Sequence, residues 1–219
     1  MADANTQRPG LSRRAQRTRY ALLTAGHQLL ADRSVDALVI DDIVQSAGVA
    51  KGTFYNHFSD KQQFALTIRE DIRLEIESMV SRANEHVDDP VMRVVRGFAV
   101  YVGYILASHQ RALVISRVNA GLASLSNPMN NGVISDIAAG LKVGRFLVPS
   151  VQAGALFVIG ACNITLMHAL EETNRASTAL IAQQLGTLLL RGLGVPLAES
   201  ETAAASAIYE FVTQSALKT

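Results

Sequence analysis

The sequence predicts an all-α fold, and three observations lead to that expectation. Apolar residues recur at intervals of three and four along most of the 219 residues, the spacing that places side chains on one face of a helix. Only five prolines interrupt the chain, and no segment shows convincing strand alternation. Hydrophobic residues make up 49% and charged residues 18%, a balance typical of a packed, soluble protein.

The N-terminal region is basic. Between Arg8 and Arg19 the chain carries five arginines and no acidic residue. Residues 1–12 contain a Pro-Gly pair and are expected to form a disordered arm, followed by a helix over residues 13–32. Such a basic cluster is either a solvated, mobile segment or a surface that contacts phosphate groups.

Two short helices joined by a tight turn are predicted within residues 41–61. Gly48 follows the first helix, at the position where a left-handed residue ends a helix without a steric penalty. The second helix is expected over residues 50–58, with Phe54 and Phe58 facing inward because they are four residues apart. This arrangement is a helix-turn-helix.

The other face of the second helix carries hydrogen-bonding side chains suited to a DNA major groove. Asn56 can pair with adenine through two hydrogen bonds, and Lys51 can reach guanine or a phosphate. An ordinary solvated helix would also be polar on one face, so the polarity alone does not decide between the two. The residues expected on this face are Lys51, Thr53, Tyr55, Asn56 and His57.

The order of residues around the turn is more specific than the motif. Residues 47–64 read AGVAKGTFYNHFSDKQQF, which resembles the signature of the TetR family of transcriptional regulators. The resemblance covers about the first third of the chain. The matching positions at the turn are Ala47, Gly48, Val49, Gly52, Thr53, Phe54, Tyr55, His57, Phe58, Asp60, Lys61 and Phe64.

The resemblance implies which residues meet DNA. Tyr55, His57 and Lys61 match family positions that touch the phosphate backbone. The basic cluster lies immediately before the helix-turn-helix, which favours phosphate contacts by Arg14 and Arg17. The expected DNA-binding set is Arg14, Arg17, Lys51, Thr53, Tyr55, Asn56, His57 and Lys61.

Three positions depart from the family pattern. Ser34 stands where a glycine is usual, and Ala50 replaces a common serine and removes a possible phosphate contact. Val39 stands where a threonine usually caps the first helix of the motif, and a valine side chain cannot accept the capping hydrogen bond. We therefore expect this helix to begin one or two residues later than usual, supported by the charge of Asp41 or Asp42.

The chain is expected to divide into a DNA-binding domain at residues 13–60 and a larger helical domain at residues 61–219. A long helix over residues 61–85, capped by Ser59 or Asp60, begins the second domain. Further breaks are expected at residues 88–90, at the loop 124–131 and at Pro149. One helix begins at Pro90, and the later ones are expected over residues 110–123, 132–142, 150–172, 176–193 and 199–217.

The helices expected over residues 150–172 and 176–193 are apolar and rich in small residues, including Gly160 and Gly186. The resemblance implies that they meet their symmetry mates in a four-helix dimer interface. Close packing of small residues inside one protomer would give the same composition.

An effector pocket is implied between the helices after residue 88. Large apolar side chains there are mixed with isolated polar ones, which is the makeup of a ligand pocket. A helical core with a few satisfied polar residues has the same makeup, so each residue also has a purely structural reading. The candidate ligand-binding residues are Phe98, Tyr101, Val102, Ile105, Arg117, Met129, Phe157, Asn163, Met167 and His168.

Nothing in the sequence predicts catalysis. Cys162 and His168 are six residues apart, which puts them on different faces of a helix, so they form no thiol–imidazole pair. The five histidines show no metal-ligand spacing, and no glycine-rich phosphate loop precedes a strand. We expect no enzymatic activity, no metal and no cofactor, and we expect Cys162 to be a small buried hydrophobe.

A cytoplasmic location is expected. One cysteine cannot form an internal disulfide, and the N-terminus lacks the apolar core of a signal peptide. The most apolar stretches, residues 97–108 and 154–170, are shorter than the roughly 20 residues that cross a bilayer, so both are expected to be buried helices.

The sequence thus predicts a dimeric, ligand-responsive transcriptional regulator, most simply a repressor, that binds a near-palindromic operator and is released by a small, mainly apolar effector. Two alternatives remain open. One is a helical domain that binds small molecules and no longer binds DNA. The other is a constitutive DNA-binding protein without an effector.

Overall fold

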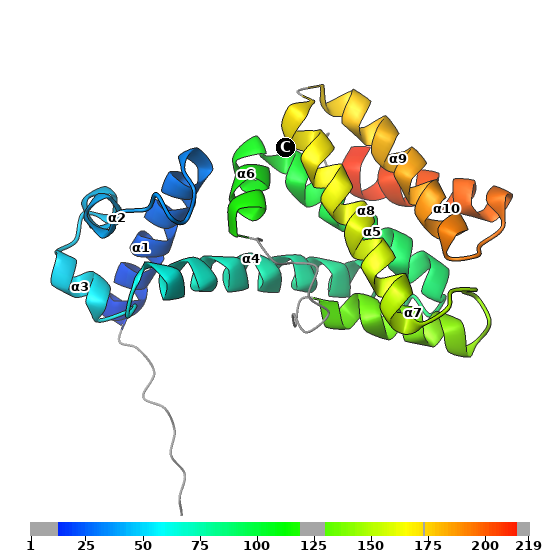
Figure 1. Ribbon diagram of the computed structural model, residues 1–219, viewed down its shortest axis with the longest axis horizontal. Helices are drawn as coiled ribbons and strands as arrows, with labels where there is room; N and C mark the ends of the chain where they lie inside the picture. The colour runs from blue at the N-terminus through cyan, green and yellow to red at the C-terminus, as the bar shows by residue number, and fades with distance from the viewer. Residues whose placement is uncertain (1–12, 119–129, 173, 214–219) are drawn as a thin grey trace, which may run out of the picture. The chain divides into compact units, whose positions relative to one another are not determined.

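The computed structural model describes residues 13–118, 130–172 and 174–213, and within these ranges the regular elements are all helical (Figure 1). The predicted all-α class is therefore confirmed. The helices are α1 (Arg13–Asp32), α2 (Ile40–Ala47), α3 (Lys51–Tyr55), α4 (Lys61–Ala83), α5 (Pro90–Ala107), α6 (His109–Val118), α7 (Asn131–Lys142), α8 (Val151–Glu171), α9 (Arg175–Gly192) and α10 (Leu197–Ile208), with a π-helical turn at Tyr209–Thr213.

The chain forms two compact units that meet between Ile68 and Arg69, inside α4. In the first unit three phenylalanines on α3, the following turn and α4 lie almost completely buried, with neighbouring ring centroids 4.9 to 5.5 Å apart. Gly26 of α1 lets α4 approach closely, because a Cβ there would lie 2.4 Å from the Phe64 ring. The three rings are those of Phe54, Phe58 and Phe64.

α2 ends as predicted but begins earlier than expected. Gly48 is left-handed (φ 66°), and the amides of Gly48 and Val49 donate to the carbonyls of Gln45 and Val44, the hydrogen-bond pattern of a Schellman motif. The helix begins at Ile40 with Val39 at the N-cap, so the expected delay does not occur. The extended backbone of Val39 suits a β-branched residue, and its carbonyl accepts the first helical hydrogen bonds without help from the side chain.

α3 is shorter than predicted. It ends at Tyr55, and Asn56 is its C-cap. The amides of His57 and Phe58 both donate to the carbonyl of Phe54, which closes a tight turn in place of a further helical turn. Phe58 still faces inward, because this turn carries its ring into the aromatic cluster.

α4 begins where the sequence places it. The Asp60 carboxylate accepts a hydrogen bond from the Gln63 amide at 2.8 Å, and the Gln63 side chain accepts one from the Ser59 amide at 2.6 Å. This reciprocal pair resembles a capping box. The helix ends at Ala83, two residues before the expected end, and His86 soon follows with a left-handed φ of 63°.

In the second unit α5 packs against α7, α8, α9 and α10, and its apolar side chains form much of the core. α5 and α8 are both long and apolar enough to cross a membrane, a test that core helices of soluble proteins also pass. In α5, 61% of the apolar stretch is buried, whereas in α8 only 39% of the apolar stretch is buried. The expectation that both stretches are short and buried is thus wrong for α8, which has 21 residues and an exposed face.

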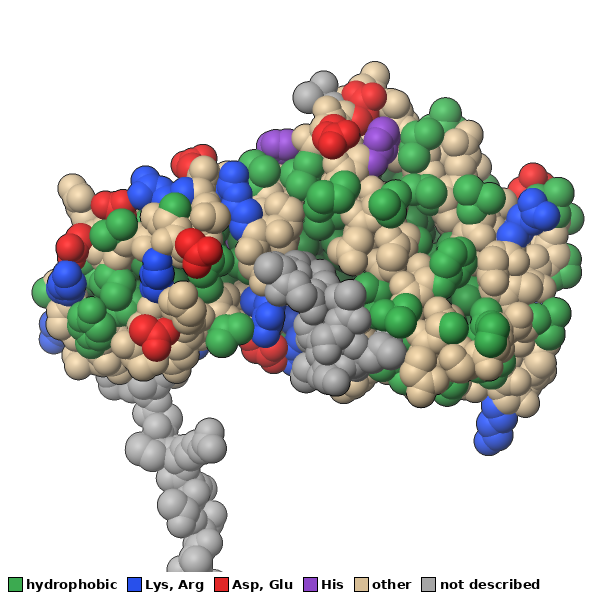
Figure 2. All heavy atoms as spheres, viewed as in Figure 1, with side chains coloured by type: hydrophobic (Ala, Val, Ile, Leu, Met, Phe, Trp, Pro, Cys, Tyr) green, Lys and Arg blue, Asp and Glu red, His purple; other side chains and the backbone are tan. Residues whose placement is uncertain are grey.

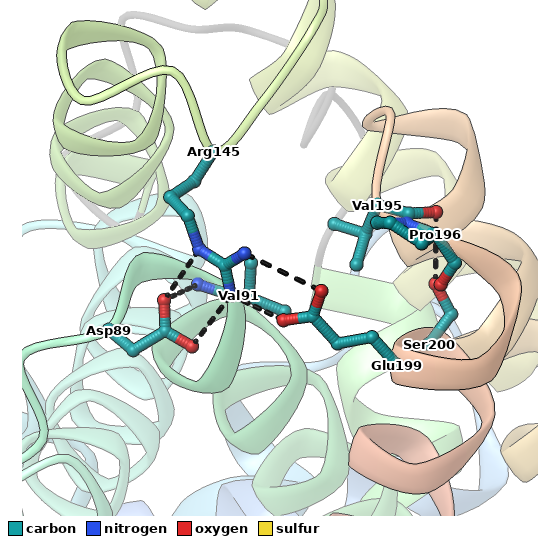
Figure 3. A network of polar contacts seen from close by, with 7 residues as sticks. All are labelled: Asp89, Val91, Arg145, Val195, Pro196, Glu199 and Ser200. Carbon is teal, nitrogen blue, oxygen red and sulfur yellow. Dashed lines mark hydrogen bonds and ion pairs between the residues drawn. The ribbon is translucent and has the colours of Figure 1, made fainter.

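Arg145 ties three segments of the second unit together (Figure 3). Its guanidinium donates to Asp89, the N-cap of α5, and to Glu199 in the first turn of α10. Asp89 also accepts from the Val91 amide, as expected for a residue that caps a helix beginning at a proline. The loop between α7 and α8 is thereby held against two helix N-termini.

Several expectations fall outside the described residues. These are the arm over residues 1–12, most of the loop 124–131 including Met129, residues 119–123 of the helix that follows α5, and the end of the C-terminal helix beyond residue 213.

Candidate DNA-binding surface and effector cavity

The polar side of α3 faces solvent. Lys51, Tyr55 and Asn56 are exposed, with 51% of the Tyr55 surface accessible, whereas Thr53 and His57 are half-buried. The orientation follows from Phe54, which is completely buried and directs the opposite side of this five-residue helix outward.

Lys51 does not present a free charge. Its ammonium lies 2.8 Å from the carboxylate of Asp41, in the first turn of α2, and this hydrogen bond is the main reason that the pKa of Lys51 is raised. Both side chains remain more than half exposed, so a phosphate could replace Asp41 as the partner.

Lys61 is engaged with the backbone. Its ammonium donates to the carbonyl of Asp36 at 2.5 Å and to that of Leu38 at 3.4 Å, so it fastens the α1–α2 connection to the start of α4. A lysine has three donors, and two are used here. A phosphate contact by Lys61 stays a prediction, but the residue also holds the fold.

On α1, Arg14 and Arg17 are exposed, in keeping with the expected phosphate contacts, which stay predictions. Arg19 behaves differently, because its guanidinium lies 4.8 Å from the centroid of the Phe58 ring. This cation–π contact joins the basic helix to the turn after α3.

The second unit contains a cavity of about 160 Å³ among α4, α5, α7 and α8. Its apolar wall comes from residues such as Ile76, Val94 and Phe98, and two arginines that form ion pairs also line it. Arg73 pairs with Glu70 and Glu77 along α4, and Arg93 pairs with the buried Asp136 at 2.6 Å.

The structure brings only part of the predicted ligand set to this cavity. Phe98, Tyr101 and Asn163 line it. Val102 and Ile105 are buried elsewhere in the core, and Met129 lies outside the described residues. Four others do not line it: Arg117, Phe157, Met167 and His168.

Two of these four face outward from α8, where Phe157 and Met167 are each 46% exposed. His168 is half-buried, and its Nε2 has no hydrogen-bond partner among the residues that the structure describes. Because α8 is apolar on nearly every side, sequence periodicity could not separate its cavity-facing residues from its outward-facing ones.

Sequence reasoning missed several lining residues. The charged ones on α4, α5 and α7 read as ordinary surface positions, and no sequence signal shows that they meet around one cavity. Cys162, expected to be a buried hydrophobe, lies in the wall, where burial raises the pKa of its thiol to about 12. The missed residues that carry polar groups are Arg73, Glu77, Arg93, Asn130, Asp136 and Cys162.

The outer faces of α8 and α9 carry exposed apolar side chains. Hydrophobic atoms are spread over this part of the surface in Figure 2. Gly160 is exposed, and a Cβ added there would meet nothing within 4 Å, whereas Gly186 is buried against Ala204 and Phe98 of the same chain. The assignment of Gly186 to a dimer surface is therefore wrong. The large exposed residues are Leu156, Phe157, Ile164, Met167, Leu180 and Leu188.

Comparison with known proteins agrees with the geometry of the first unit. Residues 22–68 match the family model described as bacterial regulatory proteins, tetR family. An uncharacterized HTH-type transcriptional regulator of Haemophilus influenzae is 31% identical over 74 residues, which are 33% of this chain and 36% of that protein. The HTH-type transcriptional repressor DhaR of Mycobacterium sp. is 25% identical over 109 residues, 50% of this chain and 54% of its own length.

The chain thus spans about a third to a half of the length of these curated relatives. The crystal structure of RolR without ligand resembles the whole fold, with a TM-score of 0.65 and 24% identity over 85% of this chain and 96% of that one. Over residues 22–68, which include the helix-turn-helix and the outward polar face of α3, the chain matches the tetR family of bacterial regulatory proteins, and the likeness to RolR shows the fold that the two chains share.

Proposed function

We propose that this protein is a dimeric, cytoplasmic transcriptional repressor that binds a near-palindromic operator and leaves it when a small, mainly apolar effector binds. The observation that carries the proposal is the exposed polar face of α3, held outward by the buried Phe54 within a unit that matches the family model. DhaR, which is called a repressor, supports the direction of regulation.

A dimer explains how a recognition helix of five residues gains enough affinity. Two copies of α3 would enter successive major grooves about one helical turn apart, so the operator would be a near-palindrome. The exposed apolar side chains of α8 and α9 support this part of the proposal, because they need a partner surface to leave water.

The effector would act through α4. This helix begins in the first unit, and its later residues Arg73, Ile76 and Val80 line the cavity. A ligand that fits one position of α4 better than another shifts the protein toward the better-fitting form, by an amount set by the difference in affinity. RolR has been crystallised with resorcinol and a FadR with stearoyl-CoA, which supports a ligand site in this fold without indicating the ligand.

Binding of the purified protein to the DNA flanking its own gene tests the proposal, with fluorescence anisotropy as the measurement. We expect affinity that falls steeply with salt. Tyr55→Phe should weaken binding to all sequences by about five-fold, since it removes one hydrogen bond to a phosphate. Asn56→Ala should change the sequence preference. Tyr209→Phe, at an exposed tyrosine of the second unit, is the matched control and should bind as wild type.

Two results would contradict the proposal. No binding to duplex DNA, together with no retention on heparin, would favour a helical small-molecule-binding protein. Binding to DNA, together with a thermal-shift screen in which no compound raises the melting temperature, would favour a constitutive DNA-binding protein.

A further inference from the structure

The cavity in the second unit has a size that favours a small ligand. Its volume is about 160 Å³. A cavity of about 150 Å³ made in another protein binds benzene, so this one has room for a single ring. The wall around it is mainly apolar, with Phe98 and Val158 among its members.

Two polar groups in the wall are unused within the described part of the chain. Neither the hydroxyl of Tyr101 on α5 nor the amide of Asn163 on α8 makes a hydrogen bond with the described residues. Burial raises the pKa of the Tyr101 phenol, so its hydroxyl stays neutral and able to donate. The Tyr101 phenol interacts electrostatically with Cys162, the residue before Asn163 on α8, and both Tyr101 and Asn163 line the cavity.

The charged groups of the wall, by contrast, are already satisfied. Arg73 donates to Glu70 and Glu77, and Arg93 donates to Asp136 and to two backbone carbonyls. An anionic ligand would have to break one of these pairs and leave a carboxylate behind without a partner, which is costly in a partly buried site.

We propose that the cavity binds a neutral molecule of one ring with a hydroxyl group at its edge, a simple phenol or cyclic alcohol, whose hydroxyl bonds to Tyr101 and Asn163. The hydroxyl donates to the amide oxygen of Asn163 and accepts from Tyr101, while the ring lies against the apolar wall. This inference rests on the proposed function, because it names the chemical class of the effector.

Calorimetric titration of the full-length protein tests the inference with four probes: phenol, toluene, benzoate and 1-naphthol. We expect phenol to bind, and each of the other three to bind at least about ten-fold more weakly. Toluene lacks the hydroxyl, and an unpaired polar wall group lowers affinity. Benzoate is charged, and 1-naphthol has a second ring. Equal binding of toluene, benzoate or 1-naphthol, or no binding of phenol, would overturn the inference.

Two variants locate the hydrogen bonds. Tyr101→Phe and Asn163→Leu should each reduce phenol affinity about ten-fold and leave toluene affinity unchanged. Tyr104→Phe is the matched control, because Tyr104 does not line the cavity and donates to Glu75 instead. If both cavity variants bind phenol as wild type does, the inference is wrong. Circular dichroism verifies that each variant is folded.

The same titrations separate this inference from the proposed function. Phenol that binds through Tyr101 and Asn163 but does not release operator DNA would contradict the regulatory role and support the ligand class. Release of DNA by an unrelated compound, with no phenol binding, would support the regulatory role and overturn the ligand class.

Discussion

Lys51 and Lys61 show how differently two lysines of one motif are used. Both lie on the DNA-binding unit, and the sequence assigns both to DNA. Lys51 is held by the Asp41 carboxylate, which a phosphate can replace, whereas Lys61 is held by backbone carbonyls inside its own unit. Lys51 is therefore the lysine whose partner a phosphate could replace, and Lys61 has a structural role whether or not it also meets a phosphate.

This difference predicts the behaviour of Asp41→Asn. The substitution removes a negative charge beside the groove-facing helix and releases Lys51, so DNA affinity at low salt should rise about three-fold and the salt slope should steepen by about one. Asp32→Asn removes the same charge from an exposed position at the end of α1 and is the matched control. Equal affinity of Asp41→Asn and wild type across salt concentrations would show that the pair does not limit binding.

Cys162 predicts a pH dependence of stability. Burial raises the pKa of its thiol from an ordinary 9.0 to about 12. Between pH 9 and pH 12 the unfolded chain loses the thiol proton, whereas the folded protein keeps it. The stability that the buried, protonated thiol contributes is therefore complete below pH 9 and is lost as the pH rises toward 12.

The test compares urea unfolding of wild type and Cys162→Ala at pH 8 and pH 10.5. The free-energy difference between them should shrink at the higher pH, since buried tyrosines titrate in both proteins and cancel. Val158→Ala, at a wall residue that does not titrate, should show a constant difference. A constant difference for Cys162→Ala as well would mean that the thiol ionises alike in both states.

At the scale of elements, the ends of the helices are where the chain departs from simple rules. α5, α8 and α9 have N-cap side chains that accept backbone hydrogen bonds, and α2 has none. α2 relies on two acidic residues in its first turn and on the packing of Ile43 and Val44. The N-terminus of α2 therefore lacks a capping hydrogen bond, which one substitution could supply.

Val39→Thr should stabilise the protein. Val39 already has the extended backbone of an N-cap and is 50% exposed, so threonine adds an acceptor and removes little buried surface. The expected gain is about 1 kcal/mol in the free energy of unfolding. Val143→Thr, at an exposed valine after α7, is the control and should give no gain. A melting temperature of Val39→Thr at or below that of wild type would contradict this account of the cap.

The ion pairs of Arg145 predict that replacing this residue lowers the stability of the protein. Arg145→Met keeps the aliphatic stem but leaves Asp89 and Glu199 without their shared partner. All three side chains are more than a third exposed, so screening limits the cost to about 1 kcal/mol. Arg145→Lys should recover only part of it, because an ammonium cannot match the two-sided guanidinium contacts. A melting temperature unchanged in Arg145→Met would show that the loop is held by packing alone.

At the scale of the whole molecule, the proposed dimer depends on the apolar outer face of α8 and α9. Ile164 is 61% exposed on α8, and Ile164→Glu should convert the dimer into monomers in sedimentation velocity while leaving the helical content unchanged. DNA affinity should fall with it, since in the proposed function one dimer binds both half-sites. Leu197→Glu, at an exposed leucine of α10, is the matched control and should remain dimeric. A dimeric Ile164→Glu would remove this face from the interface.

Gly186 shows why such a test needs the structure. The sequence places both Gly160 and Gly186 in helices expected to form the dimer interface. Gly186 is packed against Ala204 and Phe98, so a charge there would destabilise the protomer itself, and only Gly160 lies on the outer face. Both glycines look alike in the sequence because helix periodicity does not show which face a neighbouring helix covers.

The sequence alone determined the all-α class, the helix-turn-helix with its left-handed Gly48, the inward Phe54 and a helix start capped by Ser59 or Asp60. These features depend on residues close together in the chain, whose spacing sets hydrogen bonds and helix faces directly. The tertiary structure alone decided that Lys51 meets Asp41, that Lys61 holds the α1–α2 connection, that Gly186 is buried and that Tyr101 and Asn163 share one cavity. Those features depend on packing between helices distant in the chain, and an apolar helix such as α8 does not indicate by its own pattern which side each neighbour will cover.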